Sequence, residues 1–62
     1  MTLEEAKNNI GAVVKYIPFE GCDSSQIEYG EITSVNDKYV FVRYGRKIHG
    51  EATRPEDLKF WR

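Results

Sequence analysis

Apolar positions near the start of the chain recur at helical spacing, whereas most of the remainder alternates in the manner of β-strands. Leu3, Ala6 and Ile10 lie at helical intervals, and Thr2 followed by Glu5 has the spacing of a capping box. The pattern predicts a helix of about two turns within residues 1–10, ending before Gly11. A helix this short is marginal in water, so we expect its apolar stripe to pack on the rest of the fold.

The segments predicted as strands are short and separated by turn residues. Pro18 closes the first strand because it cannot donate a ladder hydrogen bond, and Pro55 supplies a fixed backbone angle to the last turn. Five short strands, one long early loop and one tight hairpin predict a mainly β chain, a small five-stranded barrel with a short N-terminal helix, forming a single domain over residues 1–62. The predicted strands are 12–17, 30–35, 39–44, 48–53 and 58–62, with a polar loop at 19–29 and a turn at 54–58.

The register of the central hairpin decides which side chains share a face. A two-residue loop at Asn36 and Asp37 would place Glu31 opposite Val42, which sets a carboxylate on the apolar face. A three-residue loop, 36–38, avoids this at the cost of a left-handed backbone at Lys38, and we prefer it. It predicts the pairs Ile32–Val42, Glu31–Arg43, Thr33–Phe41, Ser34–Val40 and Val35–Tyr39.

The second strand of this hairpin carries large side chains on both faces. Val40, Val42 and Tyr44 form an apolar face, whereas Tyr39 and Phe41 lie on the other side. An exposed second face would be a protein-binding or self-association surface, because contiguous apolar patches are uncommon on soluble monomers. We expect instead that the N-terminal helix covers this second face, which comprises Thr33, Val35, Tyr39 and Phe41, through Leu3, Ala6 and Ile10.

Three segments of the chain resemble a family of small uncharacterised proteins encoded by bacteriophages and prophages. They are "VKYIPFEGC", "ITSVNDKYVFVRYG" and "ATRPEDL", and the resemblance covers roughly Ile10 to Leu58. The order of strand, long loop, hairpin, turn and terminal strand is also similar to that of SH3-like barrels, which include Tudor and KOW domains. The resemblance implies an SH3-like barrel and brings no established activity with it. An "ALYDY"-type segment is missing, which argues against recognition of proline-rich peptides.

The overall charge and the single cysteine limit the possible partners and location. Nine Lys and Arg against ten Asp and Glu give a net charge of −1, which argues against a nonspecific coat on nucleic acid. The sequence contains no apolar run near 18 residues and begins with an acidic, polar segment, so we expect neither a membrane span nor a signal peptide. Cys22 cannot close a disulfide within the chain, which agrees with a reducing compartment such as the cytoplasm. The resemblance to phage and prophage proteins implies that this is the cytoplasm of a bacterial host cell.

Residues capable of catalysis or metal binding are sparse. Cys22 stands between Glu20 and Asp23, whose charges disfavour a thiolate, and His49 is the only histidine. One cysteine and one histidine are too few for a zinc site, and the acidic loop lacks the spacing of a calcium loop. We therefore expect no enzyme activity, cofactor, metal or small-molecule substrate.

Charge is unevenly distributed along the chain, and this gives the main candidate site. Residues 19–31 contain four acids and no bases, whereas residues 43–54 contain four bases and the single acid Glu51. We interpret the chain as a non-enzymatic binding module, a phage or prophage accessory protein that engages a host or phage protein as a monomer or weak dimer. The alternative is a nucleic-acid-binding barrel that uses the basic segment 43–54. The candidate partner-binding residues are Arg43, Tyr44, Arg46, Lys47, Arg54, Tyr39 and Phe41.

Overall fold

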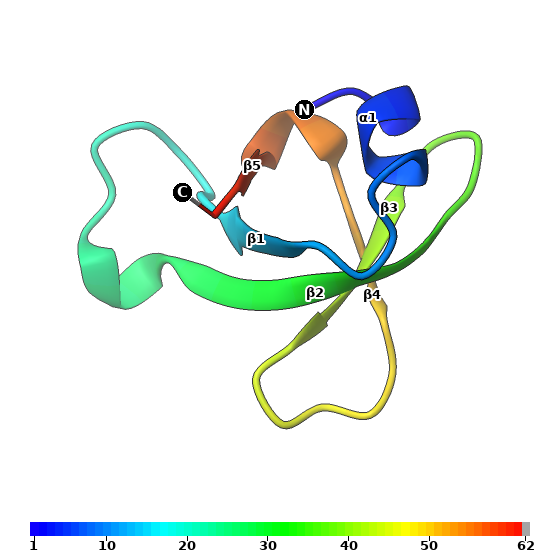
Figure 1. Cartoon of the computed structure of the whole chain (residues 1–62). Helices are drawn as coiled ribbons and strands as arrows, with labels where there is room; N and C mark the ends of the chain where they lie inside the picture. The colour runs from blue at the N-terminus through cyan, green and yellow to red at the C-terminus, as the bar shows by residue number, and fades with distance from the viewer. Residues whose placement is uncertain (62) are drawn as a thin grey trace.

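The chain folds into one antiparallel sheet of five short strands with a single short α-helix (Figure 1). The structure is a computed structural model and describes residues 1–61. The strand order is β4-β3-β2-β1-β5, and β4 and β5 occupy the two edges, so the hydrogen-bonded sheet is open. The elements are α1 (Leu3–Lys7), β1 (Val13–Tyr16), β2 (Glu28–Val35), β3 (Val40–Tyr44), β4 (Glu51–Thr53), β5 (Leu58–Phe60) and the 3-10 turns η1 (Ser24–Gln26) and η2 (Pro55–Asp57).

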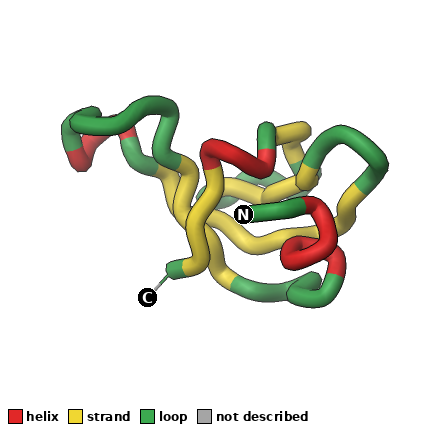
Figure 2. The backbone as a smooth tube through the Cα atoms, turned by 90° about the horizontal axis from the view of Figure 1, so that it is seen from above, coloured by secondary structure: helices red, strands yellow, loops and turns green. Residues whose placement is uncertain are grey.

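The sheet curls around one hydrophobic core, which is closed on one side by α1. Alternation along β1, β2 and β3 turns every second side chain inward, because successive side chains of a strand point to opposite faces. In Figure 2, α1 and η2 lie over the strands, while the loop between β1 and β2 projects away from them. The buried apolar residues are Ala6, Val14, Ile32, Val40, Val42, Tyr44 and Leu58.

The predicted capping box is present, but the helix is shorter than expected. The Thr2 hydroxyl accepts the Glu5 N–H at 3.1 Å, and the Glu5 carboxylate accepts the Thr2 N–H at 2.9 Å. The helix ends at Lys7, and Gly11 then adopts a left-handed φ of 93°, which favours glycine. The Gly11 N–H donates to the Ile32 carbonyl at 2.8 Å, so the turn leads the chain directly onto β2.

The expectation that α1 covers the second face of the hairpin is wrong for Tyr39 and Phe41. Ala6 is fully buried in the main core with Val40 and Val42, and Tyr39 is 41% exposed. Phe41 is half-buried beneath Gly50, where an added Cβ would lie 3.1 Å from the Phe41 Cβ. An added Cβ at Gly50 would also clash with the Thr33 hydroxyl, so the close approach of the chain before β4 to Thr33 and Phe41 favours glycine at this position.

The predicted hairpin register is correct in its first half and wrong in its second half. The pairs Ile32–Val42 and Glu31–Arg43 are confirmed. A bulge between Ile32 and Ser34 then shifts the register, so the structure pairs Ser34 with Phe41 and Val35 with Val40. The predicted pairs Thr33–Phe41, Ser34–Val40 and Val35–Tyr39 are therefore wrong.

The bulge has a physical reason in the burial of Val35. An extra residue in one strand reverses the alternation beyond it, so Thr33 and Ser34 both face solvent and Val35 packs against the core. The Thr33 hydroxyl donates to the Phe41 carbonyl at 3.0 Å across this irregular step. Strict alternation would have placed Val35 on the solvent side, which is why the simple register failed.

The hairpin loop is also closed differently from the prediction. No non-glycine residue among 1–61 has a positive φ, so the left-handed backbone expected at Lys38 is wrong. The Asn36 side-chain oxygen accepts the N–H groups of Lys38 at 2.8 Å and Tyr39 at 2.6 Å, and the Asn36 N–H donates to the Tyr39 carbonyl at 3.0 Å. An asparagine side chain thus replaces the backbone carbonyl of a tight turn, which removes the need for a strained residue.

We predict that Asn36→Ala destabilises the protein, because it removes the acceptor of two backbone N–H groups. The expected loss is about 1 to 2 kcal/mol in the free energy of unfolding, measured by urea denaturation. Asn36→Asp retains a side-chain oxygen at the same position and should keep most of the stability. Equal losses in the two variants would show that this oxygen does not hold the loop.

We predict that Val42→Ala costs about 1 to 3 kcal/mol of stability, because Val42 is fully buried and its removal leaves a cavity. Val13→Ala makes the same chemical change at a valine that is 50% exposed, and should change the free energy of unfolding by less than about 0.5 kcal/mol. Thermal melts of both variants provide the measurement. Similar melting temperatures for the two would contradict the assignment of Val42 to the core face.

Candidate binding surface

The basic segment identified in the sequence does not form a free positive patch. Arg43 lies on β3, Arg46 and Lys47 lie in the β3–β4 loop, and Arg54 lies just before η2. Three of these four cations face a carboxylate, and only Arg46 has no ion-pair partner among residues 1–61. The pairs are Arg43–Glu31 at 3.1 Å, Lys47–Glu51 at 2.6 Å and Arg54–Glu56 at 2.9 Å.

The charged state of these pairs is reinforced by their mutual contacts. The hydrogen bond to Glu51 raises the pKa of Lys47, and the hydrogen bond to Glu56 raises the pKa of Arg54. The same Arg54 contact lowers the pKa of Glu56, so both partners stay charged at neutral pH. Exposed pairs contribute little to stability, because water and salt screen the attraction between their charges. They nevertheless place a carboxylate beside each cation, with which a phosphate would have to compete.

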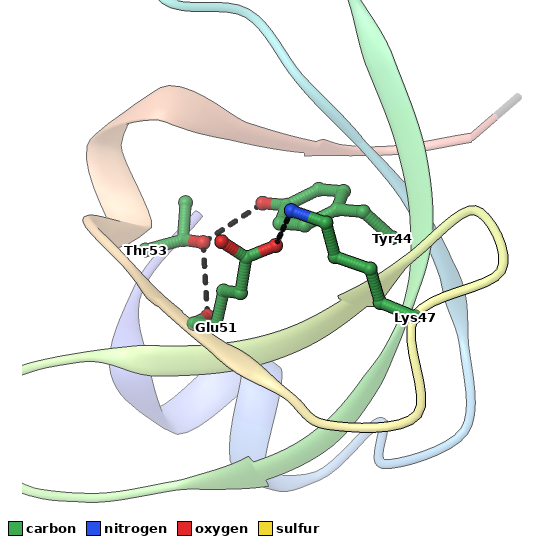
Figure 3. Close-up of polar contacts among 4 residues, drawn as sticks. All are labelled: Tyr44, Lys47, Glu51 and Thr53. Atoms are coloured by element: carbon green, nitrogen blue, oxygen red, sulfur yellow. Dashed lines mark hydrogen bonds and ion pairs between the residues drawn. The ribbon is translucent and has the colours of Figure 1, made fainter.

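Tyr44, predicted as a stacking residue within the basic segment, belongs to the core. It is 6% exposed, and its hydroxyl is 2.8 Å from the Thr53 hydroxyl, as Figure 3 shows. Its ring meets Tyr16 edge to face with the centroids 6.1 Å apart. Desolvation raises the pKa of Tyr44, which is consistent with a structural hydroxyl. Tyr44 lines a small hollow beside Lys47 and Glu51, but its burial leaves little of the ring exposed for stacking on a ligand, so the predicted stacking role is wrong.

A second candidate surface, distinct from the basic segment 43–54, is the solvent-facing side of β5, β1 and β2, which we call the outer face. Val14 and Tyr16 point toward the core, so Val13 and Lys15 point outward by alternation. The register places Lys15 opposite Tyr29 on one side and opposite Lys59 on the other. These three side chains therefore form one row across the three strands.

A second row runs parallel to the first. The Trp61 N–H donates to the Val13 carbonyl at 3.1 Å, which continues the β1–β5 register by one residue. Val13 pairs with Glu31 on its other side, and Glu31 is held by Arg43. The outer face thus consists of Trp61, Val13 and Glu31 in one row, and Lys59, Lys15 and Tyr29 in the other.

The apolar members of the outer face are exposed and border connected hollows. Val13 is 50% exposed, Tyr29 is 51% exposed and Trp61 is 59% exposed. One hollow lies between Val13 and Trp61, and a second lies between Val13 and Tyr29, beside Arg43. Val13 borders both, so the two aromatic side chains are linked by one continuous, uneven surface.

The two lysines of the outer face are an unusual pair. Lys15 and Lys59 are direct cross-strand neighbours, and like charges in this relation are destabilising. No carboxylate lies within ion-pair distance of either ammonium group in the part of the chain that the structure describes. Two unpaired cations lie side by side here, whereas most of the predicted basic segment is neutralised.

Sequence reasoning missed this surface because its residues come from segments that are distant in the chain. The alternation in "VVKY" and "LKFW" was the available signal, since it turns Lys15, Lys59 and Trp61 to the side opposite the buried residues. It could not show that β1 lies between β2 and β5. The sheet order alone brings the two lysines together.

A third hollow, which is separate from the outer face, lies between α1 and the end of β2. Leu3, Ile10 and Val35 contribute its apolar side chains, and Lys7 and Asp37 contribute charges of opposite sign. The hollow is adjacent to the hairpin face predicted as a binding surface, but Tyr39 and Phe41 do not line it. This mixed composition indicates no particular ligand.

The groups considered for catalysis are not brought together. Cys22 lies in the β1–β2 loop and His49 in the β3–β4 loop, and these two loops project from different sides of the sheet in Figure 1. No group of three or more His, Cys, Asp or Glu side chains within residues 1–61 is placed to hold a metal ion. Nor does any helix in this range have the length and apolar character needed to cross a bilayer.

We predict that Tyr44→Phe reduces the loss of stability at alkaline pH. A folded-state pKa raised above the ordinary tyrosine value of 10.0 means that the Tyr44 contribution to stability is complete below about pH 10 and is lost as pH rises through the folded-state pKa. The difference in unfolding free energy between pH 9 and pH 11 should therefore be smaller in the variant than in the original protein. Identical differences would show that Tyr44 ionises as easily folded as unfolded.

Comparisons with known proteins do not indicate a function for this chain. No protein-family model, no curated protein and no solved structure matches the chain significantly. The outer face, with its exposed aromatic side chains and its unpaired lysines, is accordingly the feature on which a functional argument can be built.

Proposed function

We propose that this protein is a non-enzymatic binding module with an SH3-like barrel fold, which engages a macromolecule through the outer face of β5, β1 and β2. The barrel assignment is supported by the succession of strand, long loop, hairpin, short 3-10 turn and terminal strand. It is also supported by β2, an eight-residue strand that pairs with β1 along one half and with β3 along the other. Such sharing of a bent strand is typical of small barrels.

One observation carries the binding function. Val13, Tyr29 and Trp61 are each at least half exposed and lie on neighbouring segments of the sheet. Val13 borders one hollow with Trp61 and a second hollow with Tyr29. Scattered exposed apolar side chains are normal, but a contiguous group on a soluble protein marks an interaction surface. The outer face is open rather than enclosed, which suits an extended partner better than a small molecule held in a pocket.

The cellular setting follows from the sequence resemblance. A phage or prophage accessory protein would act in the cytoplasm of the bacterial host and engage a host or phage macromolecule there. A non-enzymatic role is supported by the placement of Cys22 and His49, the two residues considered for catalysis, in different loops. The outer face replaces the basic segment 43–54 and the Tyr39–Phe41 surface as the proposed site.

We predict that a photoreactive phenylalanine analogue at position 29 forms covalent adducts with a defined macromolecule in host cells. The same replacement at position 39 is the matched control, because Tyr29 and Tyr39 are exposed to a similar extent on different parts of the sheet. Adducts from position 29 alone, separated by electrophoresis and tested with nuclease and protease, would support the proposal. Adducts from position 39 alone, or from neither position, would contradict it.

A further inference from the structure

We infer that the ligand of the outer face is a single-stranded nucleic acid, whose bases stack on Trp61 and Tyr29 and whose phosphates contact Lys15 and Lys59. This inference rests on the proposed function, since it takes the outer face to be the binding surface. It differs from the nucleic-acid reading of the sequence, which placed the contacts in residues 43–54.

The arrangement of the four residues suits a flexible strand. Trp61 and Tyr29 occupy opposite corners of the two rows. Lys59 lies beside Trp61 at the start of the second row, and Lys15 lies between Lys59 and Tyr29 in that row. Trp61 and Tyr29 are two strand spacings apart across the sheet and two residues apart along the strands. These two separations together give about 12 Å between their Cα atoms. This separation exceeds the 3.4 Å rise between neighbouring stacked bases of a duplex strand, so the two rings would hold bases that are not stacked on each other. The backbone between those bases would then cross the lysine pair.

The charges of the outer face favour an anionic ligand. Lys15 and Lys59 repel each other as direct cross-strand neighbours, and an anion bound between them removes that repulsion. Glu31 is the one acid in the two rows, and its carboxylate is occupied by Arg43 at 3.1 Å. Glu28 pairs with Tyr16, whose side chain packs toward the core, so Glu28 lies on the opposite face from Lys15. The outer face is therefore locally positive although the whole chain is not.

The aromatic side chains distinguish single-stranded nucleic acid from other polyanions. Every base has a π-face that can stack on Trp or Tyr, and such stacking tolerates any sequence. A duplex keeps its bases stacked on one another and offers only phosphates to the lysines. An acidic polypeptide would satisfy Lys15 and Lys59 but would leave the exposed faces of Trp61 and Tyr29 without a matching partner. Single strands use all four residues.

The test measures binding of fluorescently labelled 12-mers, oligo-dT and oligo-rU, to the full chain by fluorescence anisotropy over a range of salt concentrations. A duplex of the same length and a glutamate-rich peptide of similar charge serve as competitors. We expect both single strands to bind, with affinity falling as salt rises, and the duplex and peptide to compete weakly. The two oligonucleotides distinguish DNA from RNA as the source of the same chemistry.

Two kinds of variant separate the stacking contribution from the charge contribution. Trp61→Leu keeps an apolar side chain but removes the π-face, and should weaken binding roughly 5- to 100-fold with little change in the salt slope. Trp61→Phe should recover most of the affinity.

Lys59→Glu should weaken binding and reduce the magnitude of the salt slope by about 0.7 or more. Lys38→Glu makes the same charge change in the hairpin loop and should bind as the original chain does; thermal melts confirm that each variant is folded.

Several outcomes would overturn the inference. If the glutamate-rich peptide binds in a Lys59-dependent manner and the single strands do not, the partner is an acidic polypeptide, while the outer face stands as a binding surface. If the duplex binds as tightly as the single strands and Trp61→Leu has no effect, the contacts are to phosphates alone. If no probe binds and position 29 also forms no adduct in cells, the proposed function fails together with the inference.

Discussion

The position of β1 between β2 and β5 is the constraint on which the rest of the structure depends. It buries Val14, ties the last strand to the hairpin and brings the beginning and the end of the chain together. The Met1 ammonium group adds to this arrangement by donating to the carbonyls of Pro55 at 2.9 Å and Leu58 at 3.0 Å. The core is small, so each of these long-range contacts carries a large share of the stability.

The same arrangement creates the proposed binding surface. A strand with neighbours on both sides must present a second face, and a chain of this size has only one helix, which packs on the core around Ala6. The outer face of β1 therefore remains in solvent together with the outward side chains of its neighbours. Val13, Lys15, Tyr29, Lys59 and Trp61 become adjacent as a direct result of the fold.

Charge shows most clearly how tertiary structure changes the interpretation of a sequence. The bases of residues 43–54 are close in sequence, but folding places a carboxylate against Arg43, Lys47 and Arg54. Lys15 and Lys59 are far apart in sequence, yet folding makes them direct neighbours that have no carboxylate partner among residues 1–61. A cluster of charged residues in the sequence is thus a weak guide to the electrostatic potential at the protein surface. Residues from neighbouring strands and loops also contribute to that potential.

The sequence by itself determined the elements and half of the hairpin register. The capping box at Thr2 and the strands follow from local patterns that act over a few residues. The pair Ile32–Val42 follows from the match of apolar and charged side chains across the hairpin. Only the tertiary structure decided the bulge at Thr33, the face of the sheet on which Ala6 packs, and the outer face, because each depends on what lies across the sheet. The bulge arises from the gain in burying Val35 against a core that no local pattern describes. The lysine pair arises from the sheet order, which is set by the packing of the whole chain rather than by any one segment.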